Sequence, residues 1–294
     1  MSAKLPNEIK WATRQRLQFI ETTAYYTGII SRSALAQAFG ISDPAATKDL
    51  KLYNELATGN LTYEPSVFGF VPNAEFQEIF ADLSPQTVLS MFANNLTVSG
   101  NPSDDEQVYG IQVETLPLPS RLPEKPVLAQ IIRAIKSGSQ LRMDYHSLSS
   151  RESNEQRIIE PHALINNGLR WHIRAYSHDT YDFRDFVLSR IKQASLLSEP
   201  AESSPDYDDD WMEIISIKLQ PHPKLNKKNR LTLKYDYNMV NDTIELNVRR
   251  ALVAYVLQRM SVDTTADYSL NPNAYQLVVV NRDEIEPFAG WAFL

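Results

Sequence analysis

The first hydrophobic pattern along the chain is helical. Leu17, Ile20 and Ala24 recur at helical spacing, which predicts an amphipathic helix over about 10–26. A second helix is expected over about 31–39, because it begins with a serine, a residue type that caps helix N-termini.

A glycine turn and a third helix follow. Gly40 ends the second helix, and Asp43-Pro44 predicts an N-cap followed by proline at the first helical position. The buried stripe of the third helix is formed by Ala46, Leu50, Tyr53 and Ala57. Residues 59–72 alternate and turn like a two-stranded hairpin. This order is typical of a winged helix-turn-helix, with the hairpin as its wing.

The next segment contains apolar positions and then linker-like stretches. Residues 74–95 predict two helices split at Ser84-Pro85. We expect these helices to lie outside the winged-helix core and therefore to be available for dimerisation. Residues 99–105 and 115–126 have linker composition, and the second stretch is rich in proline.

The remainder predicts two small domains. A helix over 126–137 precedes short alternating segments to about 199, which indicate a small β-barrel or sheet. An acidic hinge, 200–210, leads into a last part that mixes strands with one helix. The expected elements are strands at 213–219, 230–237, 243–248 and 275–280, and a helix at 249–260.

Composition limits the class of protein. Hydrophobic residues make up 43% of the 294 residues and charged residues 22%, as in ordinary globular proteins. The chain has no Cys, which excludes disulfides, a thiolate zinc site and a Cys nucleophile. No stretch approaches the length of a transmembrane span, and the first residues lack the apolar core of a signal peptide. We therefore expect a cytoplasmic protein without a membrane segment.

The formal net charge of −7 is unevenly distributed. Seven basic and six acidic residues lie in 1–73, and ten basic and eight acidic residues in 126–200. The acidic excess lies in 74–125 and in 201–294. Net charge therefore neither excludes nor supports nucleic-acid binding.

The third helix carries the candidate DNA contacts. Lys48 and Lys51 project away from its apolar stripe, where a recognition helix meets the major groove. Any helical pair with a glycine turn looks similar, but the hairpin that follows favours DNA binding. The predicted DNA-binding residues are Ser42, Pro44, Ala45, Thr47, Lys48 and Lys51.

An arginine-rich strand is the second candidate site. Along 169–176, Arg170, His172 and Arg174 share one face, opposite Trp171 and Ile173. Such a face would suit a phosphate-bearing ligand, because arginine binds phosphate bidentately. Periodicity alone favours a simpler interpretation, in which the arginines pair with acidic residues on a solvated face. The candidate acids are Asp144, Glu160, Asp182 and Asp185.

A set of short motifs in this region resembles a known family, the WYL domain. The motifs are Tyr145-x-Ser147, Arg157, Glu160-Pro161-His162, Gly168-x-x-Trp171-His172-Ile173-x-Ala175-Tyr176 and Arg184-x-Phe186-x-Leu188-Ser189-Arg190-Ile191. The name-giving tripeptide differs, since Trp171-His172-Ile173 stands where the family has Trp-Tyr-Leu. The chain is most similar to the BrxR/CapW-type regulators of phage-defence islands.

The resemblance implies an α+β multidomain fold. It implies a winged helix-turn-helix over 1–75, a helical dimerisation or linker region over 76–125, a WYL Sm/SH3-like barrel over 126–200 and a C-terminal extension domain over 205–294. It further implies a homodimeric repressor of its own defence operon, which binds an inverted-repeat operator in double-stranded DNA. The WYL domain would sense a nucleic acid or nucleotide, and no cofactor is implied. The implied ligand pocket comprises Tyr145, Ser147, Arg157, His162, Trp171, His172, Arg174, Arg184 and Arg190. The tyrosine-to-histidine difference at position 172 puts the ligand contact there in doubt.

Two other functions are compatible with parts of the sequence to different degrees. An enzyme is disfavoured, because the five His show no regular metal-ligand spacing and no P-loop or GxSxG is present. No metal site is therefore predicted. The other rival is a protein that binds RNA or single strands directly on the Sm-like barrel, which aromatic and arginine-rich strands permit.

Overall fold

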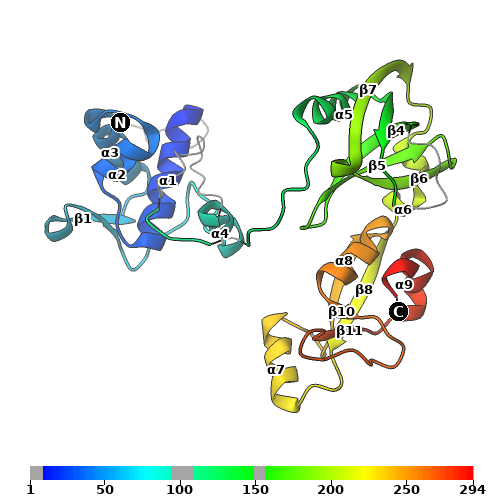
Figure 1. The fold of residues 1–294 in the computed structure, drawn as a ribbon. Coiled ribbons are helices and arrows are strands. Elements are labelled where there is room, and N and C mark those ends of the chain that lie inside the picture. The colour runs from blue at the N-terminus through cyan, green and yellow to red at the C-terminus, as the bar shows by residue number, and fades with distance from the viewer. Residues whose placement is uncertain (1–8, 94–108, 115, 149–155, 294) are drawn as a thin grey trace. The chain divides into compact units, whose positions relative to one another are not determined.

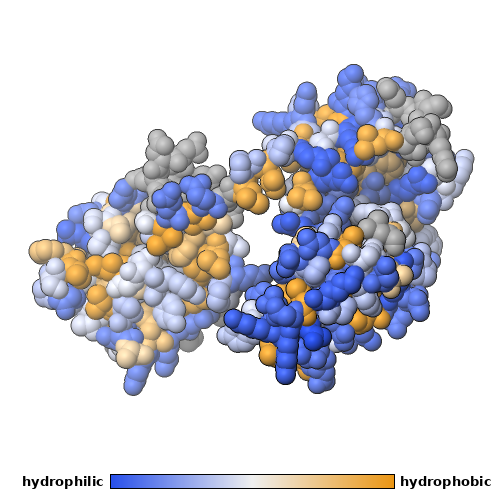
Figure 2. All heavy atoms as spheres, turned by 60° about the horizontal axis from the view of Figure 1, so that its bottom comes forward, coloured by the Kyte–Doolittle hydropathy of each residue, from blue (hydrophilic) through white to orange (hydrophobic). Residues whose placement is uncertain are grey.

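A computed structural model describes residues 9–93, 109–114, 116–148 and 156–293. The chain divides into two compact units, Met1–Pro117 and Leu118–Leu294. Each unit has its own helices and sheet (Figure 1). On the visible face of both, hydrophobic atoms occur in scattered groups among hydrophilic ones (Figure 2). Among the described residues, no helix is long and apolar enough to cross a membrane.

The first unit contains the predicted three helices and hairpin. They are α1 (Trp11–Thr27), α2 (Arg32–Phe39), α3 (Asp43–Leu56), β1 (Leu61–Glu64) and β2 (Gly69–Pro72). The two strands pair antiparallel, and the bridge between Ile30 and Phe70 ties the hairpin to the chain before α2. The predicted N-cap is wrong by one residue: Ser42 has extended backbone, and Asp43 is already helical.

Only one of the two helices predicted over 74–95 exists. It is α4 (Pro85–Ala93). The chain before it is instead held by Glu21, a fully buried side chain of α1. The Oε1 atom of Glu21 accepts hydrogen bonds from the backbone N–H groups of Ile79, Phe80 and Ala81 at 2.8, 2.8 and 3.0 Å. The Glu21 carboxylate of α1 thus accepts the hydrogen bonds of these N–H groups. In the predicted helix, backbone carbonyls four residues earlier would have accepted them.

Several apolar residues of 74–95 contribute to the winged-helix core, although Ile79 and Leu89 are exposed. Phe80 is buried there, and Phe76, Met91 and Phe92 pack against the same cluster. The expectation that this segment lies outside the core is wrong, which removes the reason for placing the dimer contact in it.

The second unit begins with a helix and a five-stranded antiparallel sheet. Its elements are α5 (Lys125–Ser137), β3 (Ser139–Tyr145), β4 (Gln156–Asn166), β5 (Trp171–Ser177), β6 (Asp182–Val187) and β7 (Ile191–Pro200). The strand order is β6-β5-β4-β3-β7, so β3 pairs with both β4 and β7. Ile131 of α5 packs with Leu141, Ile159 and Ile173 in the core.

The alternation along β5 is only partly as predicted. Ile173 and Ala175 are fully buried in the core of the sheet, but Trp171, expected on the same face, is 37% exposed at the start of the strand. On the opposite face His172 and Arg174 are also buried. The expected solvated face is therefore covered.

The C-terminal part is a small α+β domain. After the short helix α6 (Asp209–Met212) it comprises β8 (Ile214–Pro221), α7 (Lys227–Asp236), β9 (Ile244–Arg249), α8 (Val253–Arg259), β10 (Val262–Asp263), β11 (Leu277–Val279) and α9 (Arg282–Ala289). The sheet order is β10-β11-β8-β9, with β10 and β11 parallel.

The strand predicted over 230–237 is wrong, because these residues belong to α7. The Asn226 side chain caps the helix by accepting from the N–H of Asn229 at 2.8 Å. Only Leu233 is buried on this helix, so the period-two pattern did not reflect a buried face. The predicted helix over 249–260 exists as a 3-10 turn, Arg250–Leu252, followed by α8.

Candidate DNA interface and anion site

Local hydrogen bonds set the helix-turn-helix. The Ser31 hydroxyl caps α2 by accepting from the N–H of Ala34 at 3.1 Å. Gly40 has a φ of 60°, a left-handed conformation that glycine adopts without a steric penalty. The N–H of Ile41 then donates to the Ala36 carbonyl at 3.0 Å. These bonds turn the chain so that α3 packs against α2.

The predicted DNA-binding residues lie on the outer face of α3. Thr47, Lys48 and Lys51 are exposed, as are Ser42 and Pro44 before them, whereas Ala45 is half-buried. The Thr47 hydroxyl donates to the Asp43 carbonyl at 2.9 Å.

The charges of Lys48 and Lys51 are not neutralised by nearby acidic residues of the described chain. The buried Asp49 carboxylate is bound by Arg16 of α1 at 2.6 Å, so its charge is balanced inside the unit. Within the described residues, neither Lys48 nor Lys51 has an ion-pair partner. An exposed helix face with two free ammonium groups is suited to contact phosphates.

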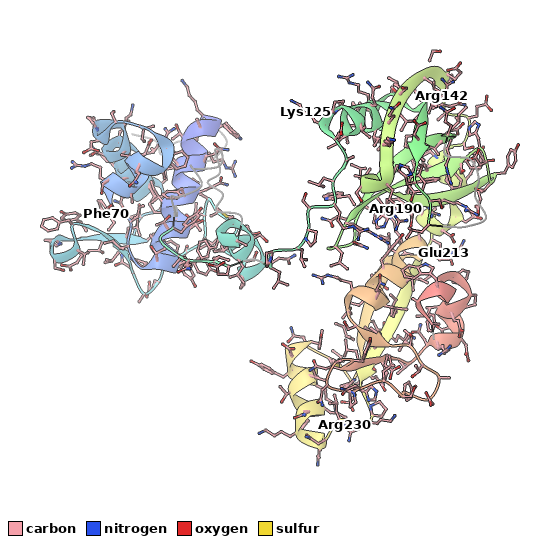
Figure 3. The ribbon with its side chains drawn as sticks, viewed as in Figure 1. Phe70, Lys125, Arg142, Arg190, Glu213 and Arg230 are labelled. Atoms are coloured by element: carbon pink, nitrogen blue, oxygen red, sulfur yellow. The ribbon has the colours of Figure 1, made fainter. Side chains whose placement is uncertain are left out.

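A groove adjoins this face, and the sequence alone did not reveal it. It has a volume of about 640 Å³ and lies between α2, α3 and the hairpin. Beside Lys51 it is lined by Asn54, Tyr63 and Phe68. Phe68 is 80% exposed at the hairpin turn, and Phe70 on β2, labelled in Figure 3, lines the groove as well. Asn54 follows Lys51 by three residues and therefore lies on the same side of α3. In the sequence, this spacing was the one indication that Asn54 adjoins the DNA-binding face.

The nine predicted ligand residues do not form one pocket. Tyr145 and Arg157 make a first group: the Cζ atom of Arg157 lies 5.1 Å from the Tyr145 ring centroid and 5.9 Å from that of Phe186, within cation–π range. The Tyr145 hydroxyl accepts from the N–H of Val187 at 3.2 Å.

His162 and Arg174 make a second group, centred on Asp208 of the acidic hinge. Arg174 donates from Nε and Nη2 to the two Asp208 oxygens, both at 2.7 Å, and from Nη1 to Asp185 at 3.2 Å. The His162 Nε2 atom lies 3.0 Å from Asp208. Asp185 also accepts from the Tyr255 hydroxyl of α8 at 2.9 Å. Arg174 is thus neutralised by two carboxylates and ties the sheet to the hinge.

The pKa directions in this network follow from burial and pairing. Burial alone would raise the pKa of Asp208, but the hydrogen bonds and charges of Arg174 and His162 lower it. Burial lowers the pKa of His162 despite the opposing effect of Asp208. Burial raises the pKa of Asp185.

His172 and Arg190 belong to a third group, which also includes Arg170 and Arg121. The His172 side chain is 1% exposed, and its Nε2 accepts from Arg170 Nε at 3.1 Å. Its Nδ1 is buried without a partner. Burial and then the charges of Arg170, Arg190 and Arg121 lower the pKa of His172 to about 4, so the ring is neutral near pH 7.

The three arginines of this group, Arg121, Arg170 and Arg190, are here called the arginine cluster. Their positive charges are not balanced by nearby acidic side chains among the described residues. Burial, followed by the charges of Arg121 and Arg190, lowers the pKa of Arg170. Within the described part of the chain, none of the three arginines has an ion-pair partner. Arg190 lies in the short turn between β6 and β7 (Figure 3). Partly buried cations that repel one another are suited to bind an anion.

Three predicted ligand residues lie outside these groups. Trp171 is 37% exposed, Ser147 is half-buried and Arg184 is exposed on β6. The sequence missed Arg121, which lies in the proline-rich linker far from the strand motifs, and Tyr255, whose ring centroid lies 5.0 Å from that of His172. Among the described residues, no group of three or more His, Asp or Glu side chains is arranged to hold a metal ion.

Three family descriptions match successive parts of the chain. Residues 12–94 match the BrxR transcriptional regulator winged helix-turn-helix domain, and residues 126–196 match the WYL domain. Residues 214–285 match the BrxR transcriptional regulator C-terminal dimerization domain.

Full-length relatives show the same relationship. The chain is 32% identical to the DNA-binding transcriptional repressor CapW of Stenotrophomonas maltophilia, over 97% of this chain and 95% of that protein. It is 34% identical to CapW of Escherichia coli strain KTE188, over 94% and 91% of the two chains. Among solved structures, proteasome accessory factor B/C of Arthrobacter aurescens aligns over 98% of this chain and 55% of its own, with 15% identity and a TM-score of 0.27. That last likeness is too slight to inform function.

Proposed function

This chain belongs to the BrxR/CapW family of WYL-domain transcriptional repressors, and from that membership we propose a specific mode of action. The chain is a DNA-binding repressor with a C-terminal dimerization domain, and its family is not one of enzymes. As a homodimer it binds an inverted-repeat operator of its own defence operon through two copies of α3. An anionic effector in the WYL domain then modulates that binding.

The exposed face of α3 is the observation that supports the DNA contact. Lys48 and Lys51 are exposed without ion-pair partners among the described residues, next to the small side chains of Ser42, Pro44, Ala45 and Thr47. Small and cationic side chains at the start of a recognition helix allow close approach to base edges and phosphates. In a two-fold dimer, half-sites would lie about 34 Å apart, or a multiple of that distance.

Lys48→Ala and Lys51→Ala should each weaken operator binding by about five- to tenfold, which corresponds to about 1–1.4 kcal/mol. The reason is loss of one charged phosphate contact, so the logarithmic salt dependence should also fall by about one. Fluorescence polarisation on the duplex upstream of the protein's own gene, over a salt series, measures both quantities.

Lys136→Ala provides a matched control, because Lys136 is exposed on α5 of the other unit. It removes the same charge and should leave affinity and salt dependence unchanged. If both α3 variants bind as tightly as the unmodified protein, the DNA contact lies elsewhere.

The effector site is proposed at the arginine cluster. A nucleotide or short nucleic acid would place a phosphate among Arg121, Arg170 and Arg190 and so relieve their mutual repulsion. Of the other predicted ligand residues, His172 is proposed to support this site, because it accepts a hydrogen bond from Arg170. Tyr145, Ser147, Arg157, His162, Trp171 and Arg184 lie outside the arginine cluster and are proposed to contact only the part of a larger ligand that extends beyond its phosphate. Arg174 is proposed to act indirectly, because its guanidinium is already bound by Asp185 and Asp208.

Arg121 gives this site a physical connection to the linker. The residue follows Pro119-Ser120 in the segment 115–126, through which the DNA-binding unit is joined to the WYL domain. An anion that binds Arg121 together with Arg190 would restrain the linker. A coupling of about 1–3 kcal/mol would change operator affinity by about 5- to 150-fold.

Arg190→Ala should leave basal operator binding intact but reduce the response to an anionic effector by at least about fivefold. The substitution removes one cation from the cluster and leaves the DNA-binding unit unchanged. Polarisation on operator DNA, with ATP and a short single-stranded oligonucleotide as separate probes, measures the response. Arg133→Ala, an exposed arginine of α5, is the control. If Arg190→Ala responds as strongly as Arg133→Ala, the effector binds at another site.

Direct binding of single strands to the sheet is not favoured. That function needs an open strand face, but on β5 the His172 ring is covered by Tyr255 and Arg174 is bound by Asp208.

A further inference from the structure

Helix α7 has an apolar stripe that the described residues of its own unit do not cover. Its inward side chain, Leu233, is 7% exposed, whereas Leu231 is 54% exposed and Tyr235 is 86% exposed. At about 100° per residue, Leu231 and Tyr235 lie about 40° apart on the helix surface, and each points about 160° away from Leu233. Val240, just beyond the helix, is 72% exposed. Figure 1 shows α7 at the edge of its domain.

The stripe is chemically complementary to an inverted copy of itself. Lys227 and Lys228 lie at its N-terminal end and Tyr235 lies at its C-terminal end, and all three line the same surface as Leu231. When two such helices lie antiparallel, the basic end of each meets the aromatic end of the other. A two-fold contact requires this self-complementarity.

The family match indicates what covers the stripe. Helix α7 lies within 214–285, the stretch that matches a dimerization domain. A ten-residue helix with a single buried side chain also gains little from its own packing, since isolated helices of this length are marginal in water. A second copy of this chain is therefore the occupant that fits.

We propose that α7 packs antiparallel against α7 of a second copy, about a two-fold axis that passes beside Leu231. Leu231 contacts its equivalent on the axis, and the Lys227 ammonium lies over the Tyr235 ring of the other copy. This proposal rests on the homodimer proposed above and names the contact at its centre.

The helix pair is the centre of the interface and not all of it. Stable interfaces bury about 1,200–2,000 Å² in total, which exceeds what two ten-residue helices cover. Central, well-packed aromatic side chains nevertheless carry a large share of binding energy. Substitution on the stripe should therefore have a large effect on dimerisation.

The first experiment is a cysteine cross-link. Because the sequence contains no Cys, Leu231→Cys introduces the only thiol of the chain. On a two-fold axis this thiol meets its equivalent, so mild oxidation should give a disulfide-linked dimer, provided the Cα atoms approach to about 4.4–6.8 Å. Asn229→Cys, on the same helix but off the stripe, should remain uncross-linked under the same conditions. Equal cross-linking at both positions, or none at Leu231→Cys, would overturn the proposed contact.

The second experiment measures dimerisation directly. Leu231→Lys brings two further cations together on the axis and should raise the dimer dissociation constant at least about 30-fold. Asn229→Lys adds the same charge off the stripe and should remain dimeric. Because Leu231 is half exposed in one chain, circular dichroism should show both variants folded. Sedimentation equilibrium separates the dimer from the 33.5 kDa chain.

The outcomes separate this proposal from the one it rests on. A monomeric unmodified protein at micromolar concentration would overturn the homodimer itself. A dimeric unmodified protein, together with a Leu231→Lys variant that dimerises as tightly, would overturn only the α7 contact.

Discussion

Glu21→Ala should destabilise the N-terminal unit by about 3–5 kcal/mol and abolish operator binding. Each buried polar group that loses its partner costs about 1–3 kcal/mol, and whole domains are stable by only about 5–15 kcal/mol. Glu21 supplies the acceptor for three consecutive backbone N–H groups, of Ile79, Phe80 and Ala81. Its Oε2 also accepts from the buried Tyr53 hydroxyl at 3.0 Å. Among the described residues, Glu21 is the acceptor recorded for these three N–H groups, so the substitution leaves them unpaired.

Hydrogen exchange of the full chain measures this effect region by region. Amides of Ile79–Ala81 and of α1 should lose protection in Glu21→Ala, while those of β3 to β5 should keep it. Glu78→Ala is the matched control, because Glu78 is exposed beside the same segment. Equal protection in the two variants would mean that the Glu21 carboxylate does not hold this segment.

The same segment shows where sequence reasoning ends. The helix-turn-helix was predictable because its determinants are local: the Ser31 cap, the left-handed Gly40 and a proline at the start of α3. The chain at 76–84 was not predictable, because its conformation depends on a carboxylate about 58 residues earlier in the sequence. The apolar spacing there is the same for a helix and for an irregular segment that packs on a core.

The error at 230–237 has a different origin. Period-two alternation normally reports a half-buried strand. In α7 the alternation of apolar and polar residues has no such meaning. Only Leu233 of this helix is buried, so packing within the domain does not require helical spacing of the other apolar residues. The side chain of Leu231 is not packed against its own unit. This misled the strand prediction, and it also makes Leu231 a candidate for contact with another molecule.

The site was predictable in its residue types but not in its pairings. Alternation along β5 puts His172 and Arg174 on the same side of the strand, and Arg170 lies beside His172 just before the strand begins. Which arginine is neutralised depends on Asp208, which lies 34 residues after Arg174 in the acidic hinge. Arg121 reaches the cluster from a linker that carries none of the strand motifs. Long-range contacts of this kind leave no periodic signal.

Asp208→Ala should destabilise the second unit by about 3–5 kcal/mol, the usual cost of removing one partner from a buried ion pair. Asp208 is 1% exposed and binds Arg174 through two hydrogen bonds of 2.7 Å. Without it, the buried guanidinium keeps Asp185 at 3.2 Å and the more distant, half-buried Asp210 at 3.7 Å. The His162 ring and the N–H of Trp211 would also lose their acceptor. Asp209→Ala, the exposed neighbouring residue, is the control and should unfold like the unmodified protein.

The pH dependence of unfolding gives this prediction a second readout. The folded-state pKa of Asp208 lies below its ordinary value, so folding favours the ionised form. Its contribution is therefore complete above the unfolded pKa of about 3.9 and is lost as pH falls through the lower folded value. The folded-state pKa of His162 is also lowered. This adds a loss of stability that begins near pH 6.5 as pH falls, because the unfolded chain binds a proton there that the folded chain does not.

Calorimetric unfolding of the second unit from pH 7 to pH 3 should show both declines in stability in the unmodified protein. In Asp208→Ala the decline at the acidic end should be reduced while the stability at pH 7 is already low. A variant with unchanged stability at pH 7 and an unchanged acidic decline would show that the Arg174–Asp208 pair does not hold the sheet to the hinge.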